Sequence, residues 1–306
     1  MGPYQNAKYT EIDGCDICYV DEGEGPVLLL VHGLGGSMTN WTPTIEHFSR
    51  THRVVALDLP GHGRSSIPDG DAGVELFARA VRGLLSRLGI EKVSIAGNSM
   101  GGLLSMYLAL EHAEMIENLV LVDSAGGHSF PGALGLALRR LPARWLRKMV
   151  LFFVAVVPRY RPLYRVAGVY ILNEYTRVLL DEATGTAQRP DVDRYMDWYV
   201  SSARMALGVC YAGRCGEITR PTLLVWGQKD MGVPLKVGQS LNMLINGSYL
   251  VAIPRAAHVP QLDQPELFNA AVERFLAAGE AVSAGRPEQA QAAEVDAPER
   301  NALTVG

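Results

Sequence analysis

The chain of 306 residues is long enough for one large domain, or for a core domain with an insertion. Its 48% hydrophobic and 20% charged residues are typical of a globular protein with a sizeable core. The formal net charge of −4 argues against a general nucleic-acid-binding protein. The sequence does not open with a positively charged region followed by a long apolar stretch, so we expect no signal peptide and a cytoplasmic protein.

Alternating buried strands and crossover helices are expected in the first 124 residues. The turn dipeptide Asp13-Gly14 separates two short strands within 8–21. Continuous apolar runs are typical of strands buried on both faces of a parallel sheet, and apolar residues at helical spacing lie between them. The expected strands are 27–31, 54–57, 93–96 and 119–123, and the expected helices are 41–48, 74–88 and 103–110. This order predicts a mostly parallel central sheet flanked by helices.

The alternation stops after residue 124 and resumes near residue 218. Residues 125–217 contain no convincing buried strand, and their prolines and glycines separate several predicted helices. The pattern then continues with strands at 222–226 and 249–253 and helices at 235–245 and 265–278. We therefore expect an α/β core of residues 1–124 and 218–278, a helical insertion at 125–217, and a disordered tail at 279–306.

Four cysteines do not indicate a metal or redox site. Cys15 and Cys18 lie in the predicted N-terminal hairpin, whereas a redox C-x-x-C motif belongs at the start of a helix. Cys210 and Cys215 have a spacing that is unusual for structural zinc. We therefore expect neither a metal nor an organic cofactor.

A candidate nucleophile lies between a predicted strand and a predicted helix. The sequence Gly97-Asn98-Ser99-Met100-Gly101 has the Gly-x-Ser-x-Gly pattern in the strand–turn–helix context that gives the pattern meaning. The two glycines avoid a clash where strand and helix pack around a tight turn. We expect Ser99 on a strained backbone, with its hydroxyl exposed at the carboxyl edge of the sheet.

A serine hydroxyl needs a base, and the base needs a third group that fixes its tautomer. His258 lies in a loop just past the last predicted strand, at the edge where open α/β sheets carry their sites. Asp230 follows the strand at 222–226 and gives the chain order Ser, Asp, His of a nucleophile elbow. Asp123 could reach the same histidine from a neighbouring strand and stays open as the alternative acid. For Asp58 we expect a role in capping the following loop.

Together, these motifs resemble those of α/β-hydrolase-fold enzymes from about residue 10 to residue 278. The matching residues are His32-Gly33, Asp58-x-Pro60-Gly61-His62-Gly63-x-Ser65, Gly97-x-Ser99-x-Gly101, Trp226-Gly227-x-x-Asp230 and His258. The resemblance implies an α/β fold in which residues 125–217 form a helical cap over the active site.

The resemblance also assigns the groups that meet the oxyanion of an acyl-transfer reaction. It implies that the backbone N–H groups of Leu34 and Met100 form the oxyanion hole. Gly33 and Asn98 are candidate substrate contacts next to these two amides.

Ser99 also separates this sequence from two branches of the superfamily. Haloalkane dehalogenases and epoxide hydrolases carry aspartate at that position. The run Asn98 to Gly102 is similar to that of carbon–carbon bond hydrolases of aromatic degradation. The sequence lacks their Gly-Pro-Gly-type oxyanion extension, and Val259 stands where they commonly place tryptophan.

Three functions follow from these comparisons of motifs. We expect a serine hydrolase that cleaves carboxylic esters with a hydrophobic acyl or alkyl part through an acyl-enzyme. Cleavage of a carbon–carbon bond in vinylogous diketones is the alternative. A non-catalytic binding protein on the same fold is a third possibility, because fold does not fix function.

The predicted insertion carries an unusual charge pattern. Between Ser124 and Asn173 there are eight Lys or Arg residues and no Asp or Glu. The nine apolar residues from Met149 to Val157 are too few to cross a bilayer, which takes about 20. Three interpretations stay open for the stretch 139–165: a helix buried against the core, a hydrophobic substrate channel, or peripheral docking on anionic lipid.

Overall fold

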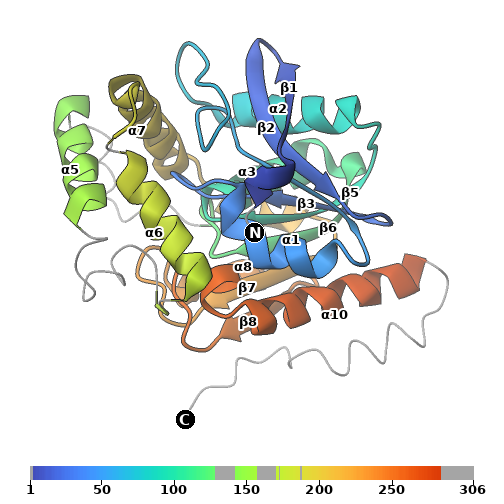
Figure 1. Cartoon of the computed structure of the whole chain (residues 1–306). Helices are drawn as coiled ribbons and strands as arrows, with labels where there is room; N and C mark the ends of the chain where they lie inside the picture. The colour runs from blue at the N-terminus through green and yellow to red at the C-terminus, as the bar shows by residue number, and fades with distance from the viewer. Residues whose placement is uncertain (1–2, 128–141, 157–169, 172, 187, 284–306) are drawn as a thin grey trace.

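The computed structural model describes residues 3–127, 142–156, 170–171, 173–186 and 188–283. Its centre is an eight-stranded sheet in the order β1-β2-β4-β3-β5-β6-β7-β8 (Figure 1). The strands are β1 Lys8–Ile12, β2 Cys15–Glu22, β3 Val27–Val31, β4 Arg53–Leu57, β5 Val93–Asn98, β6 Ile116–Val122, β7 Thr222–Gly227 and β8 Tyr249–Ile253. The β1–β2 and β2–β4 pairs are antiparallel and all other pairs are parallel. The predicted mostly parallel α/β fold is confirmed.

Helices cover both faces of the sheet. The first face carries α2 Val74–Arg87, α3 Met100–Glu111 and α8 Leu235–Leu244, and the second carries α1 Thr42–Phe48 and α10 Pro265–Ser283. Successive side chains of β3 are buried on opposite faces, with Leu29 and Val31 on the first and Leu28 and Leu30 on the second. Both faces of β3 are therefore core, which explains its unbroken apolar run. Shorter elements are η1 Pro3–Asn6, η2 Met38–Trp41, η3 Ala113–Met115 and α9 Pro260–Asp263.

The segment 125–217 is inserted between β6 and β7. Its described part contains α5 Ala143–Val156, α6 Glu174–Thr186, α7 Val192–Gly208 and the 3-10 helix η6 Ala212–Glu217, and no strand. Figure 1 shows α5, α6 and α7 together on one side of the molecule. Within the described ranges, no helix has the length and apolar character needed to cross a membrane.

Two polar contacts join the inserted helices to the core. On α6, the carboxylate of Glu182 accepts hydrogen bonds from the hydroxyls of Ser37 (3.0 Å) and Thr39 (2.9 Å). On α7, Trp198 Nε1 donates to the carbonyl of Pro60 at 2.9 Å. Both contacts fall on loops that follow strands β3 and β4, so the inserted helices lie against the carboxyl edge of the sheet.

The predicted boundary of the C-terminal tail needs a correction. The helix α10 continues through Ser283, so the first five residues of the predicted tail, 279–283, are helical. The tail is predicted because the sequence from residue 279 has no sustained apolar period, but the alanine and glutamate residues at its start favour helix and continue α10. The rest of the predicted tail, residues 284–306, lies outside the described residues.

A glycine substitution tests the close packing of β5 against α3. A Cβ atom at Gly97 would lie 2.3 Å from the carbonyl oxygen of Gly101 and 2.4 Å from Ser105 Oγ. Because a backbone atom cannot move aside cheaply, we expect Gly97→Ala to lower the free energy of unfolding in urea by about 2–3 kcal/mol. The control Gly213→Ala, with no atom within 4 Å of the added carbon, should change it by less than about 0.5 kcal/mol. Equal stability of the two variants would contradict the packing.

Candidate active site

Ser99 occupies a strained turn between β5 and α3. Its φ of +54° and ψ of −113° lie in a region that non-glycine residues rarely adopt. Backbone hydrogen bonds hold it there: its N–H donates to the Val122 carbonyl (2.9 Å), and its carbonyl accepts from Leu103 and Ala125 (both 3.0 Å). The turn therefore places the side chain of Ser99 at the carboxyl edge of the sheet, as the sequence predicts.

Asp230 and His258 form a direct hydrogen bond. His258 Nδ1 donates to Asp230 Oδ2 at 2.7 Å, and Asp230 Oδ1 accepts from the amides of Gly232 (2.7 Å) and Val233 (3.1 Å). The Asp230 side chain has no exposed surface, whereas that of His258 is 25% exposed. With Nδ1 as donor, Nε2 is left with the lone pair that a general base needs.

The charge of Asp230 is stabilised by its surroundings. Burial acts to raise the pKa of Asp230, but the hydrogen bond and charge of His258, with smaller contributions from Asp123 and the Val233 amide, outweigh it. The pKa of Asp230 is therefore held below its ordinary value, and the carboxylate is ionised at neutral pH.

Asn98 ties the nucleophile strand to the loop that carries His258. Its side-chain amide donates to the carbonyls of Val122 (3.2 Å) and His258 (3.0 Å). Both amide hydrogens are thus used in holding β5, β6 and the His258 loop together. The hydroxyl of Ser99 makes no hydrogen bond within the described part of the chain, and catalytic contacts of this kind often tighten only when substrate binds.

The glycine-rich loop after β3 lies directly against Ser99. A Cβ atom at Gly33 would be 3.1 Å from Ser99 Cβ. The backbone N–H groups of Leu34 and Met100 donate no hydrogen bond to any described residue. Met100 is also the first residue of α3, where the helix dipole favours negative charge. The two predicted oxyanion donors therefore have no partner among the described residues, and they adjoin Gly33 and Ser99, while their role and substrate contact by Gly33 or Asn98 stay predictions.

His32 holds this loop in place. Its Nδ1 donates to the carbonyl of Gly33 at 2.7 Å, and its Nε2 accepts from the amide of Leu59 at 2.9 Å. Complete burial, with a smaller effect of the nearby His62, lowers the pKa of His32 to about 3. A neutral imidazole is the form that can donate on one side and accept on the other, so this histidine links the loops after β3 and β4.

Asp123, the alternative acid, contacts Asp230. Both of its oxygens lie within hydrogen-bond distance of the Gly227 amide (3.1 and 3.3 Å), and its carboxyl bonds to that of Asp230. Burial raises the pKa of Asp123 well above its ordinary value, and the negative charge of Asp230 raises it further. Because two contacting buried carboxylates cannot both ionise, Asp123 keeps its proton, and its O–H donates a hydrogen bond to Asp230.

The same three side chains are close enough to hold a metal ion. Ligand atoms of Asp123, Asp230 and His258 all lie within 4.8 Å of one another. However, the Nδ1 proton of His258 and the proton of Asp123 already fill the space between these atoms. Metal binding would require both protons to leave. The group therefore fits a hydrogen-bonded chain better than a metal site.

Asp58 has the structural role expected from the sequence. Its carboxylate accepts from the amides of Met38 (2.7 Å) and Arg64 (2.8 Å) and from the hydroxyl of Tyr4 (2.8 Å). Burial raises the pKa of Asp58 to about 6. Asp58 therefore joins the loops after β3 and β4 to the N-terminus instead of contacting His258.

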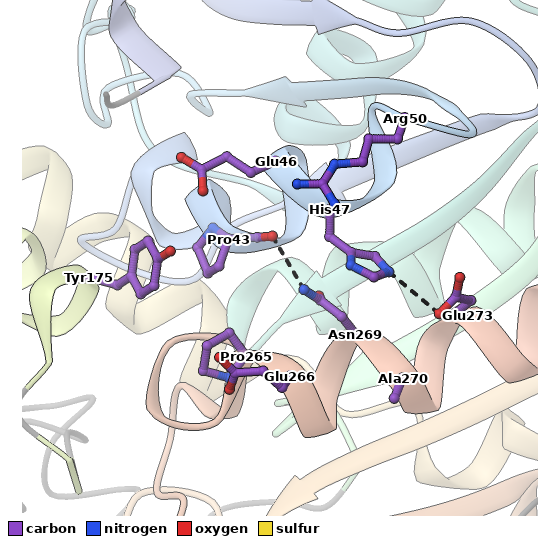
Figure 2. A pocket seen from close by; sticks show the side chains of 10 residues that line it. All are labelled: Pro43, Glu46, His47, Arg50, Tyr175, Pro265, Glu266, Asn269, Ala270 and Glu273. Atoms are coloured by element: carbon purple, nitrogen blue, oxygen red, sulfur yellow. Dashed lines mark hydrogen bonds and ion pairs between the residues drawn. The ribbon is translucent and has the colours of Figure 1, made fainter.

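A separate surface hollow lies between α1, α6 and α10 (Figure 2). Glu46 and His47 come from α1, Tyr175 from α6, and Asn269 and Glu273 from α10. None of the predicted site residues lines this hollow. It is therefore distinct from the arrangement around Ser99.

The geometry matches that of a known family. A family model described as the alpha/beta hydrolase family matches residues 28–271. The chain belongs to this family. Membership supports hydrolase chemistry for the arrangement around Ser99, and it leaves the bond that is cleaved undetermined.

Similar proteins act on different bonds. The chain is 31% identical to a 2-hydroxy-6-oxo-6-phenylhexa-2,4-dienoate hydrolase from Comamonas testosteroni, over 88% of this chain and 95% of that protein. It resembles the structure of a meta-cleavage product hydrolase from Pseudomonas fluorescens IP01, with a TM-score of 0.74, 25% identity, and 89% and 98% of the two chains covered. A thermophilic esterase from Thermogutta terrifontis gives a TM-score of 0.71, 25% identity, and 88% and 98% covered.

The protonated state of Asp123 predicts how Asp123→Asn changes stability with pH. Asn keeps a donor for Asp230 and an acceptor for Gly227, and it tolerates the φ of +42° found here. The folded protein retains a proton that the unfolded chain releases above about pH 4, so Asp123 destabilises the fold increasingly as the pH rises from about 4 towards its raised pKa. Urea unfolding should therefore show Asp123→Asn gaining stability over wild type from about pH 5 to pH 8.

The control for this prediction is Asp16→Asn, which changes an exposed carboxyl on β2. Its difference from wild type should not grow over the same pH range. A wild-type protein that gains stability relative to Asp123→Asn as the pH rises would show that Asp123 is ionised in the fold.

Proposed function

We propose that the protein is a serine hydrolase that cleaves carboxylic esters with a hydrophobic acyl or alkyl part. Ser99 is the nucleophile, His258 the general base and then the general acid, and Asp230 the group that orients and stabilises the imidazolium. The amides of Leu34 and Met100 hold the oxyanion. Family membership supports the hydrolase class, and the choice of ester as the substrate is ours.

The reaction proceeds in two steps. Ser99 Oγ attacks the ester carbonyl carbon while its proton moves to His258 Nε2, and the oxyanion that forms accepts hydrogen bonds from the two amides. The intermediate collapses to the acyl-enzyme when the C–O bond to the alcohol breaks and His258 returns the proton to the leaving oxygen. Water, activated by His258, then attacks the acyl-enzyme by the same route and releases the acid and free Ser99.

The observation that carries this proposal is the pair of amides beside Ser99, Leu34 and Met100, that donate to no residue in the described part of the chain. Each donor of this kind contributes about 3 kcal/mol of transition-state stabilisation when it meets a developing oxyanion. A pair of unpaired amides around an unbonded serine suits a carbonyl substrate, whose oxygen becomes the anion. The buried, ionised Asp230 supplies the charge that stabilises His258 once it is protonated.

We further propose that residues 125–217 act as a cap over this site. The ring of Tyr199 on α7 packs against the loop after β3: a Cβ atom at Gly35 would be 2.7 Å from Tyr199 Cε2. Trp198, the neighbouring residue on α7, packs in the same way against Gly61. These contacts place α7 against the predicted oxyanion loop after β3 and the loop after β4, where it can shape the space for the acyl or alcohol part.

Carbon–carbon bond hydrolysis is the second candidate. It is supported by the 31% identity to a 2-hydroxy-6-oxo-6-phenylhexa-2,4-dienoate hydrolase over nearly the whole chain. The run Asn98-Ser99-Met100-Gly101-Gly102 adds to this support, although the amide of Asn98 bonds to backbone carbonyls. The same triad would serve both reactions, and the two differ in whether the leaving group is an alkoxide or a stabilised carbanion.

A substrate panel separates the two candidates. We expect hydrolysis of p-nitrophenyl esters of graded acyl length, and faster turnover of medium acyl chains than of acetate, because a hydrophobic acyl part is bound. The panel should include a 2-hydroxy-6-oxo-dienoic acid, whose cleavage is measured by the decrease of its absorbance. Ser99→Ala should lower kcat/KM on any active substrate by at least about 10⁴-fold.

The matched control is Ser105→Ala, which changes a buried hydroxyl on α3 that donates to the Gly101 carbonyl. It should keep the activity. Turnover of the dienoic acid without ester turnover would replace the first candidate with the second. Full activity in Ser99→Ala would overturn both, and a purified protein inactive on the whole panel and unlabelled by a fluorophosphonate would favour a binding protein.

A further inference from the structure

The outer face of α5 presents aromatic and basic side chains together. Trp145 and Phe152 are 52% and 69% exposed, and Lys148 lies between them in the sequence and is also exposed. Positions 145, 148 and 152 are spaced by three and four residues, so they share one face of the helix. The Lys148 ammonium lies 5.6 Å from the centre of the Trp145 ring, which places the two on the same patch.

The opposite side of α5 faces the rest of the molecule. Leu146 is buried, and Arg147 forms ion pairs with Asp193 and Asp197 on α7. The helix also contacts α6, and Figure 1 shows it as the outermost of the three inserted helices. Trp145 and Phe152 therefore lie on the face of α5 that does not pack against the rest of the protein.

The charged side chains on this face of α5 are basic. Arg144 and Lys148 are exposed on α5, whereas Arg147 is the residue that pairs with the acids of α7. The sequence from Ser124 to Asn173 carries eight basic and no acidic residues in a chain of net charge −4. A partner complementary to this face is therefore anionic and offers an apolar layer for two large aromatic side chains.

We propose that the face formed by Arg144, Trp145, Lys148 and Phe152 docks on the surface of an anionic lipid bilayer. Aromatic side chains favour the boundary between headgroups and acyl chains, and basic residues are attracted to anionic headgroups. The helix lies in the interface plane, since 14 residues are too few to span the hydrocarbon core. This docking does not depend on the proposed hydrolase activity.

Docking on a bilayer would bring hydrophobic esters close to the proposed active site. The inserted segment contacts the loops at the carboxyl edge through Glu182 and Trp198. A bilayer held at α5 therefore lies next to the same inserted helices that we propose as the cap. Esters with hydrophobic parts partition into bilayers, so a docked enzyme would meet them at high local concentration.

One tryptophan makes the proposal directly measurable. Trp41, Trp198 and Trp226 are at most 3% exposed, whereas Trp145 is half exposed. A change in tryptophan emission on mixing with vesicles therefore reports on α5. We expect a blue shift with vesicles of phosphatidylglycerol mixed with phosphatidylcholine, weakened by salt. We expect no shift with phosphatidylcholine alone or in Trp145→Phe.

Substitutions matched for exposure identify the docking face. Phe152→Ser and Lys148→Glu should each lower the partition coefficient onto anionic vesicles about tenfold, measured by co-sedimentation. The controls on α8, Met243→Ser and Lys236→Glu, change residues that are also exposed but lie elsewhere, and they should leave the partition coefficient unchanged. Circular dichroism confirms that each variant is folded.

Two results would overturn the proposal. One is an absence of binding to anionic vesicles at low salt by folded wild-type protein. The other is binding that Phe152→Ser and Lys148→Glu leave unchanged. A dimer in light scattering that Phe152→Ser dissociates, without vesicle binding, would assign the face to a second copy of the chain.

Discussion

The close packing of β5 against α3 is the constraint on which the rest of the site depends. A Cβ atom at Gly97 would meet the Gly101 carbonyl at 2.3 Å, and one at Gly101 would meet the Val31 carbonyl at the same distance. Because the helix starts so close to the sheet, the one residue that joins them takes a positive φ. That residue is Ser99, and the strain in its backbone is balanced by hydrogen bonds to β6 and α3.

A second constraint is electrostatic, and it concerns two buried carboxyls that touch. Asp123 and Asp230 follow neighbouring parallel strands, so their side chains meet at the same edge of the sheet. Only one of them can be charged. Backbone amides and His258 favour the anion at Asp230, while burial keeps Asp123 neutral. The neutral carboxyl then acts as a hydrogen-bond donor to the carboxylate that contacts the histidine, which is how a second acid near a triad avoids repelling it.

The sequence predicts the core better than it predicts the inserted segment. An apolar run predicts each parallel strand, because both faces of the strand are buried. The turn at Ser99 requires glycines, and the Gly-x-Ser-x-Gly motif identifies them. The end of α10 was missed because the residues after 278 show no sustained apolar period, although their alanine and glutamate favour helix. The packing of α6 and α7 on the core could not be predicted, because single contacts such as Glu182 to Ser37 join residues far apart in the chain and leave no periodic pattern. The role of Asp123 as a protonated neighbour of Asp230 could not be predicted, because it depends on the contact between the two side chains and not on their spacing in the sequence.

The rate at which a fluorophosphonate labels Ser99 tests the central claim most directly, because it needs no knowledge of the substrate. The claim is that His258, oriented by an ionised Asp230 and not by Asp123, activates Ser99. Asp230→Asn should therefore lower the second-order labelling rate by about 10⁴-fold. Asp123→Asn should keep it within about threefold of wild type. Equal losses in both variants, or labelling that persists in Ser99→Ala, would contradict the account.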